Sequence, residues 1–257
     1  MADISTSGET SAAPEGTPGM NFFQRLGSMF FEPGRAFEDL NRRPTWIGVF
    51  VIVSILAVAS SYLLTSRIGP EAMMRKAMAM NPMTRSLSEE QIQQAIARQQ
   101  TSSFSKYSSY VFAPIGVLVG TMVIAAAYLL VFLMMGASPG FKKSLAVTFW
   151  GYLPAGLLSS LLGILMIFVK DPDTLELSPP DNLTSNLGFL VAKQEHPALH
   201  SLLASVDLFS IWTIVLLAIG FAAVSERKLT PKKTATGVLV LWVLWILGKA
   251  GFAAAFS

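Results

Sequence analysis

Two ionisable residues stand at or inside long apolar runs, where a charge is most able to do chemistry. Lys249 interrupts the last apolar run of the chain, and Asp207 opens the run before it. A charge held inside a membrane is by default a candidate for ion or proton transfer. Lys249 is only eight residues from the C-terminus, so its amine can instead reach the headgroups beyond the run. Asp207 is well placed to cap a helix. Because no second acidic residue lies within a run, we predict structural roles for both.

Histidine and methionine offer the only spacings in the chain that suit a metal ion. His196 and His200 are four residues apart, which places two imidazoles on one helix face. Pro197 favours the first position of a helix, which would put His196 at the cap and off that face. Thioethers suit Cu(I), but methionine also fills apolar helix faces. Five of them cluster in one connection: Met73, Met74, Met78, Met80 and Met83. We favour packing for both sets and predict no metal site and no cofactor.

The chain lacks the residue patterns of common enzymes. It has no cysteine, which removes thiol catalysis and disulfides. It also lacks phosphate-binding loops and the HExxH and GxSxG motifs. Asn182-Leu183-Thr184 matches a glycosylation acceptor, which matters only in a cell that glycosylates. We predict a protein without catalytic residues, and its net charge of +3 is too small to indicate nucleic-acid binding.

The composition explains why the chain has so few residues that could take part in catalysis or metal binding. Hydrophobic residues make up 52% of the 257 positions and charged residues 14%, against about 25% charged residues in soluble domains. These values disfavour a soluble enzyme, a disordered protein and a disulfide-stapled secreted module. An integral protein of the lipid bilayer remains, provided that the apolar residues form long runs.

Five apolar runs have about the length that a hydrocarbon core of about 30 Å requires, which is roughly 20 helical residues. None alternates in polarity as the strands of a membrane barrel would. We predict an all-α, polytopic membrane protein: a bundle of five transmembrane helices with amphipathic interfacial helices, its membrane domain covering residues 46–256. The expected spans are about 46–64, 111–135, 144–169, 207–224 and 235–256.

The basic connections predict the orientation of the chain. Arg42 and Arg43 precede the first run, Lys142 and Lys143 lead into the third, and a basic loop at 226–233 joins the last two. With five crossings these sites share one side, which the positive-inside rule makes the cytoplasm. The N-terminus is then inside and the C-terminus outside. The first outer connection opposes this orientation with basic residues of its own: Arg67, Arg75, Lys76, Arg85, Arg98 and Lys106.

The chain before the first run divides into a polar tail and an amphipathic segment. Residues 1–20 lack the regions of a signal peptide, so we predict a disordered cytoplasmic tail. In segment 21–45, apolar residues recur at helical spacing and break at Pro33 and Gly34. The first stripe contains Phe22, Phe23, Leu26, Met29 and Phe30, with Gln24, Arg25 and Ser28 between them, and the second contains Ala36, Phe37 and Leu40. We favour short helices packed under the bundle over a membrane-surface platform for a partner, and both stay open.

A third amphipathic helix is predicted within 71–104, on the outer side. Ser88 and Gln91 fit a capping box at its start. Ile92, Ala95 and Ile96 would form its apolar face.

Small residues and prolines within the runs predict close packing and kinks. Helices in lipid associate through small side chains. The chain offers four pairs at the required spacing: Gly116 with Gly120, Gly156 with Ser160, Ser159 with Gly163, and Gly251 with Ala255. They suit a compact bundle or a homo-oligomer equally well. Pro114 and Pro154 can kink their helices, and a kink can open a transport cavity beside polar groups such as Tyr152 and Ser159. We favour a role in packing for both prolines.

Several motifs, in order along the chain, resemble the Yip family of five-span membrane proteins. They are Phe31-Glu32-Pro33-Gly34-Arg35-Ala36-Phe37, Arg43-Pro44-Thr45-Trp46, Phe141-Lys142-Lys143-Ser144-Leu145-Ala146, Tyr152-Leu153-Pro154 and Asp207-Leu208-Phe209-Ser210-Ile211-Trp212-Thr213. The resemblance covers roughly residues 30–256 and implies a helical bundle with a cytoplasmic N-terminus. Yip proteins were first known as interactors of Rab/Ypt small GTPases, and eukaryotic members are implicated in vesicle trafficking. The family also occurs in bacteria, and the Ala- and Gly-rich spans favour a bacterial inner-membrane protein.

We therefore predict a non-enzymatic membrane protein of the Yip type, with a role in membrane organisation or protein interaction. Its expected partners are the bilayer, a membrane or cytoplasmic protein, or a second copy of the chain, and not nucleic acid. The alternative is a transporter or channel for ions, lipids or small solutes. The candidate site residues are Pro33, Phe37, Pro44, Trp46, Tyr152, Pro154, Asp207, Trp212 and Lys249.

Overall fold

The computed structural model describes residues 19–81, 83–84, 86–101, 103–178, 182–183, 185–191, 195–226 and 228–255. The predicted tail at 1–20 therefore lies outside the described residues, apart from its last two positions. Within the described part, the regular structure consists of ten α-helices and two short 3-10 helices, without a strand. The predicted all-α class is confirmed.

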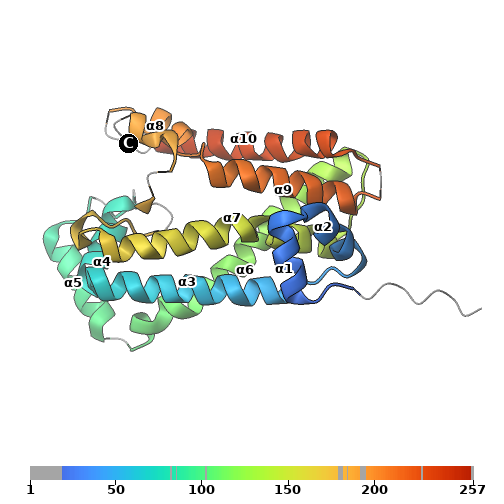
Figure 1. Ribbon diagram of the computed structural model, residues 1–257. Coiled ribbons are helices and arrows are strands. Elements are labelled where there is room, and N and C mark those ends of the chain that lie inside the picture. Colours follow the sequence, from blue (N-terminus) through green and yellow to red (C-terminus); the bar gives the residue numbers. More distant parts are fainter. Residues whose placement is uncertain are drawn as a thin grey trace, which may run out of the picture.

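Five long helices lie along one axis and alternate in direction (Figure 1). They are α3 (Ile47–Ile68), α6 (Ser103–Met134), α7 (Phe141–Val169), α9 (Leu208–Val224) and α10 (Pro231–Ala255). Each contains most or all of one predicted apolar run. The largest difference is in α6, which begins at Ser103 rather than near residue 111 because its polar first turns continue the helix.

Four of these helices are long and apolar enough to cross a membrane: Ile47–Ile68, Tyr110–Met134 within α6, Phe141–Val169 and Pro231–Ala255. The chain is thus a multi-pass membrane protein, as predicted. The shorter apolar helix α9 has 17 residues, which corresponds to about 25 Å of rise against a core of about 30 Å. By length and composition, four helices of the described chain qualify as spans, and the fifth predicted span, α9, stays a prediction.

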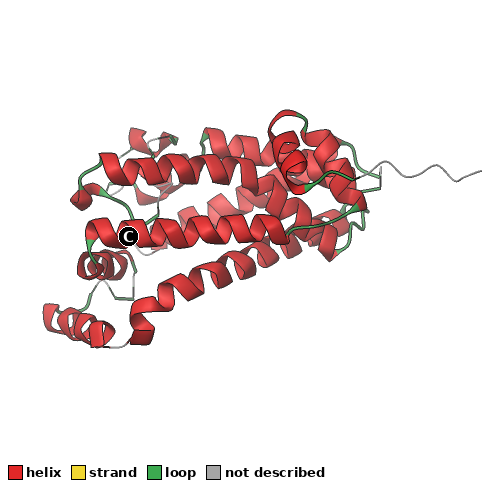
Figure 2. Cartoon of the chain, turned by 60° about the horizontal axis from the view of Figure 1, so that its bottom comes forward, coloured by secondary structure: helices red, strands yellow, loops and turns green. Residues whose placement is uncertain are grey.

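The short helices gather at the two ends of the long ones, as Figures 1 and 2 show from different sides. At one end lie α1 (Phe22–Phe31) and α2 (Pro33–Arg42), together with the α6–α7 and α9–α10 connections. At the other end lie α4 (Pro70–Met80), α5 (Glu89–Thr101), η1 (Pro172–Thr174), η3 (Leu187–Leu190) and α8 (Pro197–Leu203). The two basic connections and the amphipathic segment before the first run therefore share one end, as the sequence predicts.

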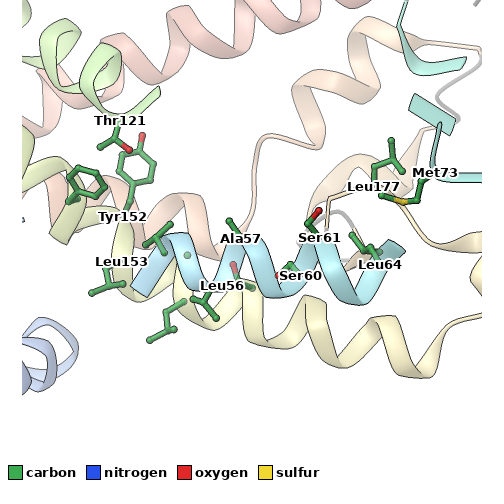
Figure 3. Close-up of a pocket in the computed structure, with 15 residues that line it drawn as sticks. Leu56, Ala57, Ser60, Ser61, Leu64, Met73, Thr121, Tyr152, Leu153 and Leu177 are labelled. Carbon is green, nitrogen blue, oxygen red and sulfur yellow. The ribbon is translucent and has the colours of Figure 1, made fainter. Parts of the chain in front are cut away.

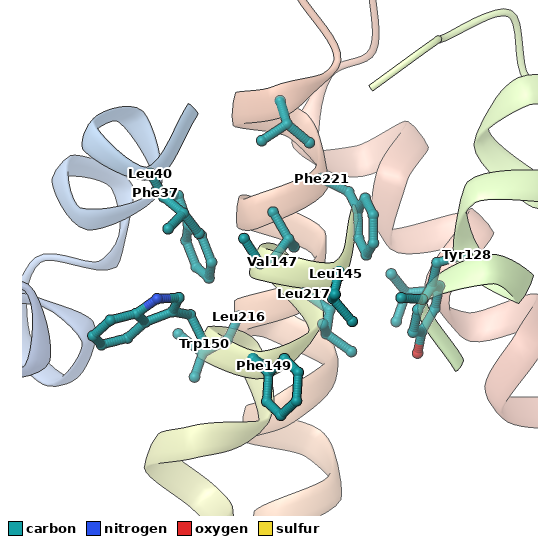
Figure 4. Packing of buried hydrophobic residues seen from close by; sticks show 14 of the residues in the cluster. Phe37, Leu40, Tyr128, Leu145, Val147, Phe149, Trp150, Leu216, Leu217 and Phe221 are labelled. Atoms are coloured by element: carbon teal, nitrogen blue, oxygen red, sulfur yellow. The ribbon is translucent and has the colours of Figure 1, made fainter. Parts of the chain in front are cut away.

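The core forms around the first half of α7, which packs against α3, α6 and α9. Nearly every residue from Ser144 to Ala155 is buried. Figure 4 shows Phe149 and Trp150 of α7 beside Leu216, Leu217 and Phe221 of α9. From α2, Phe37 and Leu40 extend into the same cluster, so the interfacial helices share the core of the bundle.

Two glycines allow the close approach around α7 and α9. A methyl group added at Gly151 would lie 2.6 Å from Leu217 Cδ2, and one at Gly220 would lie 2.7 Å from Phe37 Cε1. Neither glycine belongs to a predicted small-residue pair. Four predicted positions instead have open space around an added methyl group: Gly116, Gly120, Gly156 and Gly251. Their use as close contacts within the bundle is a wrong prediction, while the homo-oligomer interpretation stays a prediction.

Candidate functional site

The most elaborate polar contact in the described chain joins α1 to α2 through Arg25. Arg25 is almost fully buried, since only 3% of the residue's surface is exposed. Its Nε donates to Asp39 Oδ2 at 3.0 Å, and its Nη1 donates to Thr45 Oγ1. The second oxygen of Asp39 accepts the backbone N–H of Met20 at 3.2 Å. The carboxylate therefore has a partner on each oxygen, which a buried charge requires.

Trp150 of α7 connects this ion pair to the bundle. Its indole Nε1 donates to the backbone carbonyl of Thr45 at 2.7 Å. Its ring lies 5.5 Å from Arg25 Cζ, within the range of a cation–π contact. The Phe22 ring packs against it at 5.3 Å. Arg25, Asp39, Thr45 and Trp150 thus form one unit, which we name the Arg25 network.

Aromatic contacts fix the two short helices further. Phe37 has no exposed surface and packs against α9 at Gly220. The Trp46 ring, just before α3, stacks on Phe149 at 5.5 Å. Trp212 of α9 meets the Phe30 ring edge-on at 5.6 Å. The α1–α2 pair is therefore docked on α3, α7 and α9 at once.

The opposite face of α1 is free and carries large aromatic side chains. Phe23 is 78% exposed and Phe31 is 87% exposed. Gly27 lies between them and has open space around an added methyl group. These three positions are four residues apart, so they form one stripe along the helix. Eight basic residues lie on α2, in the connections at this end of the bundle, or in the first turns of α7 and α10: Arg35, Arg42, Arg43, Lys142, Lys143, Lys228, Lys232 and Lys233.

Two hollows flank α3 farther along the bundle. The inner hollow, of about 400 Å³, lies between α3, α6 and α7 (Figure 3). Its hydroxyl groups come from Ser60, Ser61, Thr121, Tyr152 and Ser160. The outer hollow, of about 1330 Å³, lies between α3, α4 and α6. The two share Ser61 and Met73, so they meet beside α3.

A comparison with protein families shows which family has a matching sequence model. The family model of the Yip1 domain matches residues 27–252. The chain belongs to the Yip1 domain family. The match confirms the resemblance that the sequence motifs indicate. It begins at Gly27, so it contains α2, the end of α1 and both hollows, whereas Phe23 and Arg25 precede it. Searches of curated proteins and of solved structures found no match.

The end of this Yip1 domain that lies opposite the α1–α2 pair contains two predicted candidates. Asp207 caps α9, since its Oδ1 accepts the N–H of Ser210 at 2.9 Å. The predicted capping role is confirmed. Lys249 Nζ donates to Ser205 Oγ at 3.1 Å, which ties α10 to the turn between α8 and α9. The Lys249 amine is therefore held by a hydrogen bond to a hydroxyl group of the protein.

Three of the basic residues that oppose the predicted orientation have local partners at this end: Arg67, Arg75 and Lys76. Arg67 donates to the carbonyl of Ile167, and Lys76 donates to the carbonyls of Asp173 and Leu175. Arg75 pairs with Glu71 at 3.2 Å and with Glu89 at 2.8 Å. The hydrogen bond from Arg75 lowers the pKa of Glu89 below its usual value. These cations connect α3 to the end of α7, α4 to α5, and α4 to the segment around η1.

Predicted metal and glycosylation motifs lie in structural positions. His196 is the residue before α8, with Pro197 at the first helical position, as expected. Among the described residues, no group of three histidine or acidic side chains could hold a metal ion. Asn182 is fully buried, and its amide bonds to the backbone of Glu176 and Ser178. A glycan has no access to that side chain, while Thr184 lies outside the described residues.

The predicted candidates thus divide among three places in the Yip1 domain. Phe37 and Trp212 hold the α1–α2 pair, and Pro33 lies at the start of α2. Pro44 and Trp46 lie between α2 and α3, where the Trp46 ring stacks on Phe149 of α7. Tyr152 lines the inner hollow, whereas Pro154 is buried in α7 one turn above Trp150. Asp207 and Lys249 lie at the far end. The sequence analysis missed Arg25, Asp39 and Trp150, and its placement of Arg25 among residues between the apolar positions is wrong.

The missed network has one sequence signal. Arg25 is three residues after Phe22 and four before Met29, so all three share a helix face. Phe23, which the predicted stripe included, points away from the bundle instead. A lone arginine on the apolar face of a short helix therefore indicates a buried acidic partner.

Proposed function

We propose that this Yip1-family protein is a non-enzymatic membrane protein that presents the α1–α2 pair as a docking surface for another protein. The observation that supports this proposal is the exposed stripe of Phe23 and Phe31 on a helix that the Arg25 network holds in place. Large aromatic side chains are typical anchors of protein interfaces. A helix that is already ordered loses little conformational freedom on binding.

The charge around the stripe indicates the kind of partner. Eight basic residues lie on α2, in the connections at the same end of the bundle, or in the first turns of α7 and α10, against three exposed acidic residues among the described positions there, Glu32, Glu38 and Glu226. One of the eight, Arg35, is paired with Glu32. A partner with an apolar groove for two phenyl rings and an acidic rim fits this surface best. A cytoplasmic protein or the cytoplasmic face of another membrane protein would meet that description. Nucleic acid is not favoured, because the net charge of the chain is only +3.

The proposed topology places the α1–α2 pair in the cytoplasm and the C-terminus outside, in the inner membrane of a bacterium. The positive-inside rule supports this orientation, since the basic connections gather at the end that carries the pair. Three of the basic residues that oppose this orientation, Arg67, Arg75 and Lys76, form hydrogen bonds within the protein. In this proposal α9 is the fifth span. The helix α9 is near the lower length limit for crossing a bilayer, about 17 residues.

Photo-crosslinking tests the proposal directly. A photo-crosslinking amino acid at Gly27 projects between the two phenyl rings and meets no atom of the chain within 4 Å. In native membranes we expect a discrete protein adduct from this position. The matched control is Gly120, which has the same open space but lies on the apolar surface of α6.

The outcomes of the crosslinking experiment separate three possibilities. A protein adduct at Gly27 that disappears when Phe23 and Phe31 are replaced by alanine supports the docking surface. An adduct with a second copy of the chain would instead assign this face to self-association. Only lipid adducts at Gly27 would overturn the proposal, because the stripe would then lie in the bilayer interface.

A second candidate function is transport of an ion, lipid or small solute. One observation favours it: the inner hollow reaches Tyr152, near the middle of α7. Broken or kinked helices with polar groups at that depth are typical of transporter sites. Vesicles containing the purified protein would show flux that Tyr152→Phe reduces. Absence of flux for all three solute classes would remove this candidate.

A further inference from the structure

The outer hollow beside α3 has the depth of one bilayer leaflet. Ser54 and Thr65 line its two ends on α3. Eleven residues of helix rise about 16.5 Å, which is close to half of a hydrocarbon core of about 30 Å. Both α3 and the apolar part of α6 are long and apolar enough to cross the membrane. The hollow therefore faces hydrocarbon over the length of a single acyl chain.

The polarity of the lining changes along this depth. Near the middle of the membrane the hollow is bounded by Ile55, Val58 and Pro114, together with the small polar side chain of Ser54. Toward α4 it is bounded by Thr65, Glu71 and Tyr107. Tyrosine is enriched at the level of lipid headgroups, because its ring is apolar and its hydroxyl is polar. This order of apolar and polar groups matches a lipid with its chain inward and its headgroup at α4.

The flexible residues of the lining favour a chain over a rigid ligand. Met73 and Met74 of α4 cover the hollow from the outer side. Methionine is unbranched and adapts to irregular apolar partners. Ala59 and Ala77 leave room between these larger side chains. An occupant of variable shape, such as a hydrocarbon chain, fits these walls.

The charge in the lining selects the headgroup. Glu71 is the charged side chain among the residues that bound the outer hollow. It already accepts a hydrogen bond from Arg75, yet Arg75 is shared with Glu89. The Glu71–Arg75 pair therefore offers a carboxylate to an amine and a guanidinium to a phosphate, which suits a headgroup that carries both charges.

We propose that the outer hollow between α3, α4 and α6 binds one phospholipid with an amine-bearing headgroup, its acyl chain lying along α3. This inference is independent of the docking surface, which lies at the opposite end of the molecule.

Lipid retention by the purified full-length protein tests the inference. The protein is reconstituted in vesicles of equal phosphatidylethanolamine and phosphatidylglycerol, extracted in mild detergent, and its bound lipid identified by native mass spectrometry. We expect one retained phosphatidylethanolamine. Ala59→Trp fills the hollow and should abolish retention, whereas the control Val123→Trp, on the exposed surface of α6, should retain it. Glu71→Gln should retain a lipid but lower the preference for the amine headgroup about threefold.

A second measurement uses the unchanged protein, so its result does not depend on whether a variant folds. Phosphatidylethanolamine with a photoactivatable acyl chain should label peptides around Val58 and Met73 of the unchanged protein more strongly than the apolar face of α10. Equal labelling of all lipid-facing helices would overturn the inference. Retention that is unaffected by Ala59→Trp, or a preference for phosphatidylglycerol, would also contradict it.

Discussion

Arg25 and Asp39 form an ion pair in which the arginine side chain is 4% exposed and the aspartate side chain 11%. They lie on different short helices, and the backbone around Thr45 and the ring of Trp150 complete their surroundings. A pair so well enclosed is weakly screened by salt, because water and ions have little access to it. The position of the α1–α2 pair therefore depends on a few named side chains.

The first prediction concerns this ion pair. Arg25→Ala leaves the Asp39 carboxylate buried without its main partner, so the free energy of unfolding should fall by about 3–5 kcal/mol. Thermal unfolding in detergent measures the loss. Arg35→Ala is the matched control, because the pair that Arg35 forms with Glu32 is exposed and should contribute about 0–1 kcal/mol. Equal effects of the two variants would contradict the role of the Arg25 network.

The second prediction concerns the indole of Trp150. Trp150→Phe keeps most of the ring but removes the donor to the Thr45 carbonyl. Thr45 is an exposed residue, so water can reach its carbonyl, and loss of this part-buried hydrogen bond should cost about 0.5–1.5 kcal/mol and lower the unfolding temperature accordingly. Trp245→Phe removes the same group from an exposed position on α10 and should leave stability nearly unchanged. A drop of the same size in both variants would show that the hydrogen bond is not the cause.

The third prediction tests the close approach at Gly220. Gly220→Ala places a methyl group 2.7 Å from both Phe37 Cε1 and Val147 Cγ1. Such overpacking should destabilise the protein by about 1–3 kcal/mol. Gly116→Ala adds the same methyl group in open space and should not destabilise. Phe37→Leu combined with Gly220→Ala should recover part of the loss, and its failure to do so would place the strain elsewhere.

Local features of this fold could be predicted from the sequence because their partners are close along the chain. The capping box of Ser88 and Gln91 is present, with bonds of 2.9 and 3.3 Å. Asp207 caps α9 as expected. The apolar runs appear as helices, since hydropathy alone determines which segments prefer lipid.

Features that need the packed bundle could not be predicted. Arg25 on the apolar face of α1 indicates a buried acidic partner, but Asp39 lies on a second helix, so the sequence does not identify which residue that partner is. The glycines that matter, Gly151 and Gly220, are recognised only when the helices they meet are known. The hollows beside α3 depend on how α4 and α6 diverge from it, which no local pattern encodes.

The fourth prediction concerns the pKa of Glu89. Its hydrogen bond from Arg75 stabilises the charged carboxylate, so the pKa lies below the reference value of 4.5. The stabilisation is present above the unfolded-state pKa and is lost as the pH falls through the lower, folded-state pKa. A carboxyl titration by NMR should show this shift, and Arg75→Gln should return the pKa toward 4.5. An unchanged pKa in Arg75→Gln would show that the pair does not form in solution.

The fifth prediction decides whether α9 crosses the membrane. The chain has no cysteine, so single cysteines report accessibility to a membrane-impermeant maleimide without background. Leu199→Cys in α8 and Lys228→Cys after α9 lie at opposite ends of α9. If α9 is the fifth span, intact cells should label Leu199→Cys at once and Lys228→Cys only after permeabilisation. If α9 does not cross, both positions should behave alike.

Gly34→Cys in the exposed part of α2 fixes the orientation: it should match Lys228→Cys, because both lie at the end that carries the basic connections. Labelling of Gly34→Cys in intact cells would reverse the orientation and move the Phe23–Phe31 stripe out of the cytoplasm.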